Sequence, residues 1–251
     1  MDRLQLFFRT SIVLLLTSLM AGCSSYEWGW YVLDPRTEQG LINVIFLTQG
    51  FTDTISVSLL SMFFAMFIGL LVTFPALSHR PWLRAINRVY VEVIRSIPVL
   101  VLLLWVYYGM PTLMDISLNH FWAGVIALSL AESAFMAEVF RGGIQSIDKG
   151  QHEASQALGL NYWKTMRHII LPQAFRQMLP PLGNQFVYIL KMSSLVSVIG
   201  LSDLTRRANE LVVNEYLPLE IYTFLVVEYL VLILIVSQGV RWLEKRQFNY
   251  G

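Results

Sequence analysis

Cysteine is almost absent from the 251-residue sequence, which contains only Cys23. A disulfide needs two thiols, and a cysteine-based zinc or iron-sulfur site needs several thiolates. The sequence therefore excludes an internal disulfide and such metal centres, and it predicts no redox chemistry.

Charge is scarce as well. Only 14% of the residues are charged, and 18 Lys and Arg are offset by 17 Asp and Glu, which leaves a formal net charge of +1. Proteins that bind nucleic acid carry a clustered basic surface for the phosphates. The basic residues here are scattered along the chain, so we expect no nucleic-acid partner.

Motifs of nucleotide binding and hydrolysis are also missing. No G-x-x-x-x-G-K-[ST] loop is present, so ATP must be bound by a separate subunit if ATP is used. His152-Glu153 begins a zinc-protease H-E-x-x-H, but Gln156 occupies the position of the second histidine. The G-x-S-x-G of serine hydrolases is absent too. We expect no metal, no cofactor and no enzymatic activity.

Long apolar runs are the main feature that remains, since 55% of the residues are hydrophobic. A helix needs about 20 mostly apolar residues to cross the hydrocarbon core, and irregular backbone cannot face lipid. The runs predict an all-α integral membrane protein with five core transmembrane helices. These spans are predicted at 52–77, 93–110, 121–140, 182–201 and 218–240.

Basic residues in the connecting segments predict the orientation, because Lys and Arg are retained on the cytoplasmic side. The loop after the first span, the longest loop and the C-terminal tail are basic and are predicted inside. Segments 24–50 and 111–120 together contain a single Lys or Arg, which is Arg36, and both are predicted outside. Arg206 and Arg207 weaken the pattern, but alternation of the spans places their loop outside.

The first 23 residues form an N-terminal hydrophobic segment with more than one interpretation. Arg3 and Arg9 precede an apolar run, 11–20, that is short for a span. It is an uncleaved signal anchor, a short first helix, or a lipoprotein signal in which Leu19-Met20-Ala21-Gly22-Cys23 is similar to a lipobox. Met20 departs from the aliphatic residue usual there. Each interpretation places residue 24 outside.

The longest loop contains the most specific pattern in the sequence. It reads Glu153-Ala154-Ser155-Gln156-Ala157-Leu158-Gly159, then nine residues, then Ile169-Ile170-Leu171-Pro172. Gly159 can adopt positive φ and end a helix, and a second helix is predicted to start near Asn161 and to stop before Pro172. These signals predict a helix-turn-helix elbow on the cytoplasmic side.

This loop resembles the hallmark of the inner-membrane permeases of binding-protein-dependent ABC importers, which runs E-A-A, three residues, Gly, nine residues, I-x-L-P. Every spacing matches, and Ser155 replaces the second alanine. The resemblance implies the type I ABC importer permease fold in a bacterial cytoplasmic (inner) membrane. It also implies partners: ABC ATPase subunits, an extracytoplasmic solute-binding protein and a second permease subunit. Contact with the ATPase is assigned to Glu153, Ala154, Gly159, Leu171 and Pro172.

Further segments resemble the polar amino-acid branch of these permeases, which carry histidine, glutamine or glutamate/aspartate. They are 91–98 (VEVIRSIP), 137–146 (AEVFRGGIQS), 149–151 (KGQ) and 171–176 (LPQAFR), while 103–105 (LLW) is most similar to the glutamate/aspartate permeases. The resemblance implies translocation of a polar amino acid by alternating access.

Three ionisable residues fall near the middle of predicted spans: Glu132, Lys191 and Glu228. A charge near the bilayer centre costs about 2.5–3.5 kcal/mol on insertion scales, so it usually faces a cavity or a partner. One hypothesis is that Lys191 lines the substrate pathway with Ser193, Ser194 and Glu132 and binds the substrate carboxylate. Residues 191–195 are similar to the K-D-T-S-L of the family. The alternative is that Glu132 or Glu228 pairs with Lys191 to neutralise it.

These predictions divide the chain into a hydrophobic segment, 1–23, an extracytoplasmic segment, 24–50, and a permease domain, 51–251, with a coupling loop at 141–181. Three alternatives remain: a permease for another small solute, a membrane scaffold, and an intramembrane enzyme that uses Glu132 and Glu138 as a carboxylate pair. The last is disfavoured because residues six apart do not share a helix face.

Overall fold

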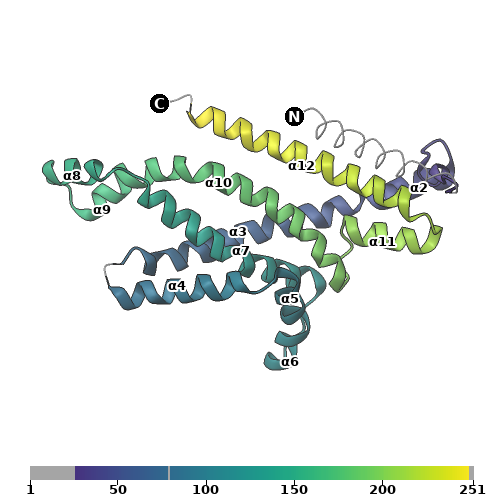
Figure 1. Ribbon diagram of the computed structural model, residues 1–251, viewed down its shortest axis with the longest axis horizontal. Helices are drawn as coiled ribbons and strands as arrows, with labels where there is room; N and C mark the ends of the chain where they lie inside the picture. The colour runs from purple at the N-terminus through teal and green to yellow at the C-terminus, as the bar shows by residue number, and fades with distance from the viewer. Residues whose placement is uncertain (1–25, 79, 249–251) are drawn as a thin grey trace, which may run out of the picture.

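The computed structural model describes residues 26–78 and 80–248. The predicted N-terminal segment, including Cys23, lies outside this range. The described chain is built of helices, which confirms the all-α prediction (Figure 1). In chain order they are η1 (Trp30–Leu33), α2 (Glu38–Thr48), α3 (Gly50–Ala76), α4 (Pro81–Ser96), α5 (Val99–Leu104), the π turn η2 (Trp105–Gly109), α6 (Met110–Met114), α7 (His120–Gln145), α8 (Lys149–Ala157), α9 (Tyr162–Thr165), the π turn η3 (Met166–Ile170), α10 (Leu171–Met192), the 3-10 helix η4 (Ser193–Ile199), α11 (Leu204–Glu215) and α12 (Pro218–Phe248).

Four helical stretches in the described chain are long and apolar enough to cross a membrane, and a bent pair supplies a fifth. The predicted spans 52–77, 121–140 and 218–240 correspond to α3, α7 and α12, and 182–201 corresponds to the second half of α10 with η4. Helices α2 and α3 together form a 39-residue stretch, Glu38–Ala76. At 1.5 Å per residue it is about 58 Å long, which exceeds the roughly 30 Å hydrocarbon core. One end therefore extends beyond the apolar layer.

Helices α3 and α7 form the centre of the bundle, and small residues let them approach closely. On α3 the buried positions include Ser58, Ser61, Ala65, Gly69 and Thr73, and α7 presents alanines and serines in return. Ser129 Oγ donates to the Ser61 carbonyl at 3.3 Å, and Thr73 Oγ1 donates to the Ala137 carbonyl at 3.2 Å. Close backbone contact and hydroxyl hydrogen bonds hold transmembrane helices together where lipid removes the hydrophobic driving force.

The prediction of one continuous second span at 93–110 was wrong. Helix α4 ends at Ser96, and α5 starts at Val99 in a direction that differs by 95°. Ile97 has φ −91° and ψ 123°, an extended conformation. Pro98 explains the break, because a proline disfavours helical backbone at the preceding residue and lacks the N–H that would continue the helix. Figure 1 shows α5 and α6 leaving the body at a steep angle.

The prediction that the elbow's second helix stops before Pro172 was also wrong. The chain is helical from Tyr162 through η3 and α10 to Ile199, a stretch of 38 residues. In the π turn the Leu171 N–H donates to the Met166 carbonyl, and Pro172 follows in the first turn of α10. A π turn changes the hydrogen-bond spacing, which accommodates a proline that would otherwise clash one turn upstream. The hydrogen-bond spacing therefore changes just before Pro172, but the helix continues.

Helix α11 packs against α2 and α12 at the end of the molecule opposite α8 and α9 (Figure 1). Arg207 Nη1 donates to the Phe46 carbonyl at 3.2 Å and to Gln49 Oε1 at 3.1 Å, so it ties α11 to the junction of α2 and α3. Arg206 pairs with Glu210 at 2.7 Å. Both arginines thus have structural partners in the predicted outer loop.

Candidate functional site

The elbow at one end of the molecule is formed by α8, a turn at Gly159, and α9. The Gly159 N–H donates to the Gln156 carbonyl at 2.9 Å, and the Leu160 N–H donates to the Ser155 carbonyl at 3.0 Å. Gly159 has φ +72°. This pair of bonds around a left-handed glycine is the Schellman motif that closes helix C-termini. The predicted turn at Gly159 is confirmed.

Side-chain caps fix where each helix of the elbow begins. Asp148 Oδ1 accepts from the Gly150 N–H at 2.6 Å, and Asn161 Oδ1 accepts from the Lys164 N–H at 2.9 Å. Each cap satisfies a backbone donor that has no partner inside its helix. The turn is therefore defined on both sides by local sequence, and the predicted restart at Asn161 is confirmed.

A chain of hydroxyl hydrogen bonds closes the inside of the elbow. Thr165 Oγ1 donates to Ser155 Oγ at 3.0 Å, and Ser155 Oγ donates to the His152 carbonyl at 2.7 Å. Both hydroxyl residues are buried. Ser155 is the one departure from the family pattern, and sequence reasoning treated it only as a small residue. Its partner ten residues away could not be identified before the turn was known.

The outer surface of the elbow is exposed and partly apolar. Glu153 and Ala154 are exposed. Leu158 and Trp163 are each 77% exposed, and Tyr162 is 59% exposed. Large apolar side chains clustered on an exposed tip are typical of a surface that a partner covers. The predicted contact residues Glu153, Ala154 and Gly159 belong to this tip.

The other two predicted contact residues, Leu171 and Pro172, lie on the first turn of α10, where Leu171 lines an apolar groove with residues of α3 and α7. Both are exposed. Pro172 lines a groove of about 360 Å³ together with Gln151 of α8. Gln173 Nε2 donates to the Ile169 carbonyl at 2.8 Å and reaches Gln151 Oε1 at 3.4 Å. The fold thus brings the two halves of the motif together on one end of the molecule.

Lys191 lies apart from the buried carboxylates. It is exposed and lines a cavity of about 520 Å³ between α10 and α12. In the described chain, ion pairs within 4.0 Å join only Arg141 to Glu138 and Arg206 to Glu210, so the proposed pairing of Lys191 with Glu132 or Glu228 is not present. Glu132 accepts a hydrogen bond from Gln185 instead. Gln185 and Lys191 are six residues apart, about 240° around α10, and so face different ways.

The two serines after Lys191 have separate environments. Ser193 is buried and donates to the Leu190 carbonyl at 2.8 Å, and Ser194 donates to the Lys191 carbonyl at 2.8 Å. Both hydroxyls thus bond to their own helix, although a hydroxyl oxygen can still accept a second bond. Of the four candidates for a substrate pathway, Lys191 is the one that lines the cavity between α10 and α12.

A charged cavity between α4 and α7 was not predicted as a site. Its volume is about 430 Å³. Arg141 is held by Glu138 at 2.8 Å, and the Arg95 guanidinium lies 4.7 Å from the centre of the Phe135 ring. Glu138 and Glu132, the carboxylate pair of the enzyme alternative, have different partners, Arg141 and Gln185. The cavity is lined by Ala76, Arg84, Asn87, Arg88, Val91, Glu92, Arg95, Glu138, Arg141 and Gln145.

Comparison with known families gives one match over most of the chain. Residues 44–249 match the family described as binding-protein-dependent transport system inner membrane component. The match includes α3 to α12 and the whole elbow.

Curated relatives share this length. The chain is 39% identical over 202 residues to the glutamine transport system permease protein GlnP of Escherichia coli (strain K12), covering 80% of this chain and 92% of that protein. It is 37% identical over 193 residues to the arginine transport system permease protein ArtQ of Bacillus subtilis (strain 168), covering 76% and 88%.

Solved structures agree with these sequence matches. An amino acid ABC transporter crystallised with histidines superposes with a TM-score of 0.77 at 35% identity, covering 82% of this chain and 96% of that chain. The MetNI methionine ABC transporter in an inward-facing conformation superposes with a TM-score of 0.69 at 20% identity, covering 80% and 95%. The second match concerns the fold alone.

Proposed function

Because the chain belongs to the family of binding-protein-dependent transport system inner membrane components, we propose that it is the permease subunit of an ABC importer for a polar amino acid. Members of this family are transport subunits and not enzymes. The chain is a multi-pass inner-membrane protein. The cargo is supported by the likeness to permeases named for glutamine and arginine. Glutamine and arginine are therefore the first candidates, and glutamate is added because residues 103–105 resemble the glutamate/aspartate permeases.

The exposed, partly apolar tip of the elbow is the observation that supports the mechanism. Its exposed tip fits a groove of an ATPase subunit, with Glu153 and Ala154 beside Leu158 and Trp163. A solute-binding protein would deliver the amino acid at the opposite end, where α2 and α11 lie (Figure 1). A second permease subunit, identical or not, would complete the pathway.

The helix that begins in the elbow continues into the membrane, so a movement of the ATPase subunits would reach the substrate pathway through it. Since α9, η3, α10 and η4 form one 38-residue helical stretch, movement of the tip displaces α10 along its length. Pro180 and Pro181 lie inside α10. Each lacks the N–H that would bond one turn back, so α10 can bend there. ATP-driven closure of the ATPase subunits would tilt α10 and open the pathway to the other side.

Reconstitution tests this function. The chain is co-purified with its ATPase and solute-binding protein, placed in proteoliposomes, and assayed for ATP-dependent uptake of radiolabelled L-glutamine, L-glutamate and L-arginine. Uptake of one of them that requires all the components is the expected result. Uptake of a solute that is not an amino acid, with none of the amino acids accepted, would contradict the proposed cargo.

A further inference from the structure

The charged cavity between α4 and α7 joins two segments that the sequence singled out and that the elbow does not explain. Residues 91–98 supply Glu92 and Arg95, and residues 137–146 supply Glu138, Arg141 and Gln145. They lie about 45 residues apart in the chain. The packing of α4 on α7 brings them to the walls of one cavity.

The charges in this cavity are only partly neutralised. Arg141 is paired with Glu138, whereas Arg84, Arg88 and Arg95 have no carboxylate within 4.0 Å among the described residues. Glu92, the remaining acid on the wall, has no cation within that distance in the same part of the chain. Three guanidinium groups and one carboxylate are therefore available to a ligand.

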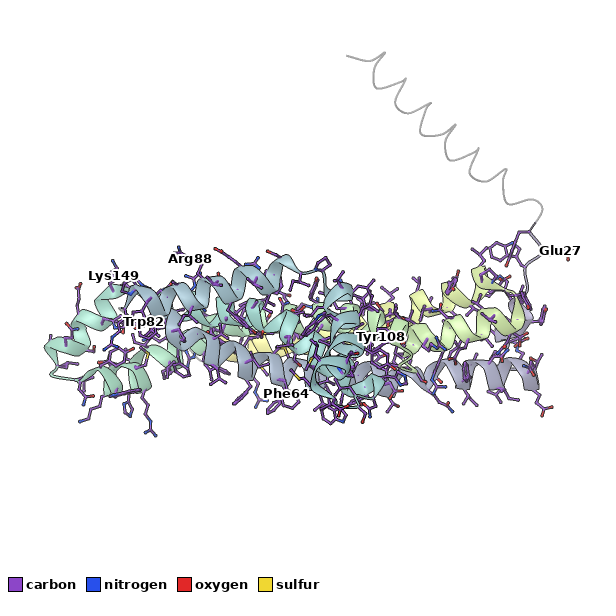
Figure 2. The ribbon with its side chains drawn as sticks, turned by 90° about the horizontal axis from the view of Figure 1, so that it is seen from below. Glu27, Phe64, Trp82, Arg88, Tyr108 and Lys149 are labelled. Carbon is purple, nitrogen blue, oxygen red and sulfur yellow. The ribbon has the colours of Figure 1, made fainter. Side chains whose placement is uncertain are left out.

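Helix α4 turns these charges away from its apolar surface. Trp82, Ile86, Val89 and Val93 repeat every three or four residues and are more than half exposed, so they form a face suited to lipid. Arg84, Arg88 and Arg95 lie on a second face, about 150° around the helix. Figure 2 shows Arg88 at one edge of the molecule, toward the end that carries Lys149. An arginine face opposed to a lipid-facing one is suited to water.

The arginine face also has a direction. Arg84 and Arg95 are 11 residues apart, which is about 16 Å along an α-helix. The row leads from the α3–α4 connection, at the same end as α8 and α9 (Figure 1), to the bend at Pro98. A single lipid headgroup cannot contact a row of this length. A small solute that moves along it can.

We infer that this cavity is a cytoplasm-facing station for the transported amino acid, which binds its carboxylate to Arg84 and Arg88 and its ammonium group to Glu92. Guanidinium groups bind carboxylates in a fork geometry. All three side chains are exposed, so each contact is weak. Weak binding suits a site that must release its ligand. This inference rests on the proposed function.

Cysteine labelling of the complete transporter in proteoliposomes tests the station. The background variant is Cys23→Ala, and the probe is Gln145→Cys on the α7 wall of the cavity. Labelling of this chain by an anionic and by a cationic methanethiosulfonate is followed by mass spectrometry. We expect faster labelling by the anionic reagent, and protection by whichever of glutamine, glutamate and arginine the wild type takes up.

The double variant Arg84→Gln/Arg88→Gln should abolish the preference for the anionic reagent and raise the concentration for half-protection about ten-fold, the loss expected when two exposed charged contacts are removed. Arg80→Gln is the matched control, because Arg80 is exposed and basic but does not line the cavity.

Three results would overturn the station: equal labelling by both reagents, protection unchanged in the double variant, or a cavity closed to both reagents in the assembled complex. The last result would assign this surface to a subunit interface. Wild-type uptake is measured separately. Absence of amino-acid uptake by the wild type would overturn the proposed function itself, whereas normal uptake with any of the three results would overturn the station alone.

Discussion

Thr165 donates a 3.0 Å hydrogen bond to Ser155 across the turn that Gly159 makes. The two residues belong to the two helices of the elbow, and both are buried. The bond joins α8 to the stretch that continues into the membrane as α10. In the proposed mechanism, movement of the exposed tip would be passed to α10 through this closed elbow.

Thr165→Val removes the donor of this bond while keeping the shape of the side chain. We expect a loss of about 1 kcal/mol, or roughly 2–4 °C in apparent melting temperature of the purified transporter. Ser155→Ala should cost a similar amount, and the double variant should cost less than the sum of the two. Thermal unfolding of the four proteins in detergent measures this. Additive losses would show that the bond contributes nothing.

Gly159→Pro should uncouple ATP hydrolysis from transport. Proline fixes φ near −65°, whereas Gly159 has φ +72°, and it removes the N–H that bonds to Gln156. Gly159→Asn is the control, because asparagine tolerates this backbone and nothing lies within 4 Å of the added Cβ. Glu153→Lys tests the tip itself and should also uncouple. The measurement is ATPase activity stimulated by the loaded binding protein; normal stimulation in Gly159→Pro would remove the coupling role.

Gly69→Ala should destabilise the α3–α7 contact. An added Cβ would overlap the Cβ of Met136 and lie 3.0 Å from the Ala137 nitrogen. Overpacking of this kind costs about 1–3 kcal/mol. Gly239→Ala is the matched control, since nothing lies within 4 Å of its added Cβ and alanine favours a helix by up to about 1 kcal/mol. Equal melting temperatures for the two variants would contradict the packing argument.

The stability of the outer end should fall as the pH rises. Burial raises the pKa of Asp203 to about 7. The hydrogen bond that Asp203 accepts from the Arg206 N–H acts in the opposite direction and lowers the pKa. An acid whose pKa is raised by folding contributes stability that is fully present below its ordinary pKa of 3.8 and is lost as the pH rises through about 7.

Asp203→Asn keeps an N-cap and removes the buried charge. Its apparent melting temperature should exceed that of the wild type at pH 8, because the raised pKa of the wild-type carboxyl costs on the order of 4 kcal/mol of stability at that pH. The difference between the two proteins should shrink as the pH falls and should be smallest near pH 4, close to the ordinary pKa of 3.8. The measurement is thermal unfolding of both from pH 4 to 8, and parallel curves would contradict a titration at Asp203.

Lys191→Met separates a pathway role from a structural one. Lys191 has no ion-pair partner in the described chain and faces a cavity, so its loss should leave the complex assembled. We expect uptake to fall about ten-fold or more if the lysine binds the substrate carboxylate, and Lys191→Arg should retain part of it. Uptake and size-exclusion profiles are measured together. Dissociation of the complex in Lys191→Met would assign a structural role instead.

Local signals predicted four of the spans and the turn at Gly159. A transmembrane helix satisfies its own backbone, so an apolar run such as 52–77 is sufficient to identify α3. The turn at Gly159 and the cap at Asn161 likewise depend on residues a few positions away. The effects of Pro98 and Pro172 were harder to predict from the sequence. Pro98 follows a break between two helices, whereas a π turn accommodates Pro172 within a continuing helix.

The sequence by itself determined the membrane class, the five apolar runs and the position of the elbow, because each depends on a short stretch of chain. Tertiary structure alone decided that Lys191 stands apart from Glu132, that Thr165 meets Ser155, and that residues 84–95 and 138–145 share a cavity. The physical reason is that these relationships depend on how helices pack and rotate against one another. Buried small residues contribute to that packing, as Gly69 does by letting α3 approach α7 closely.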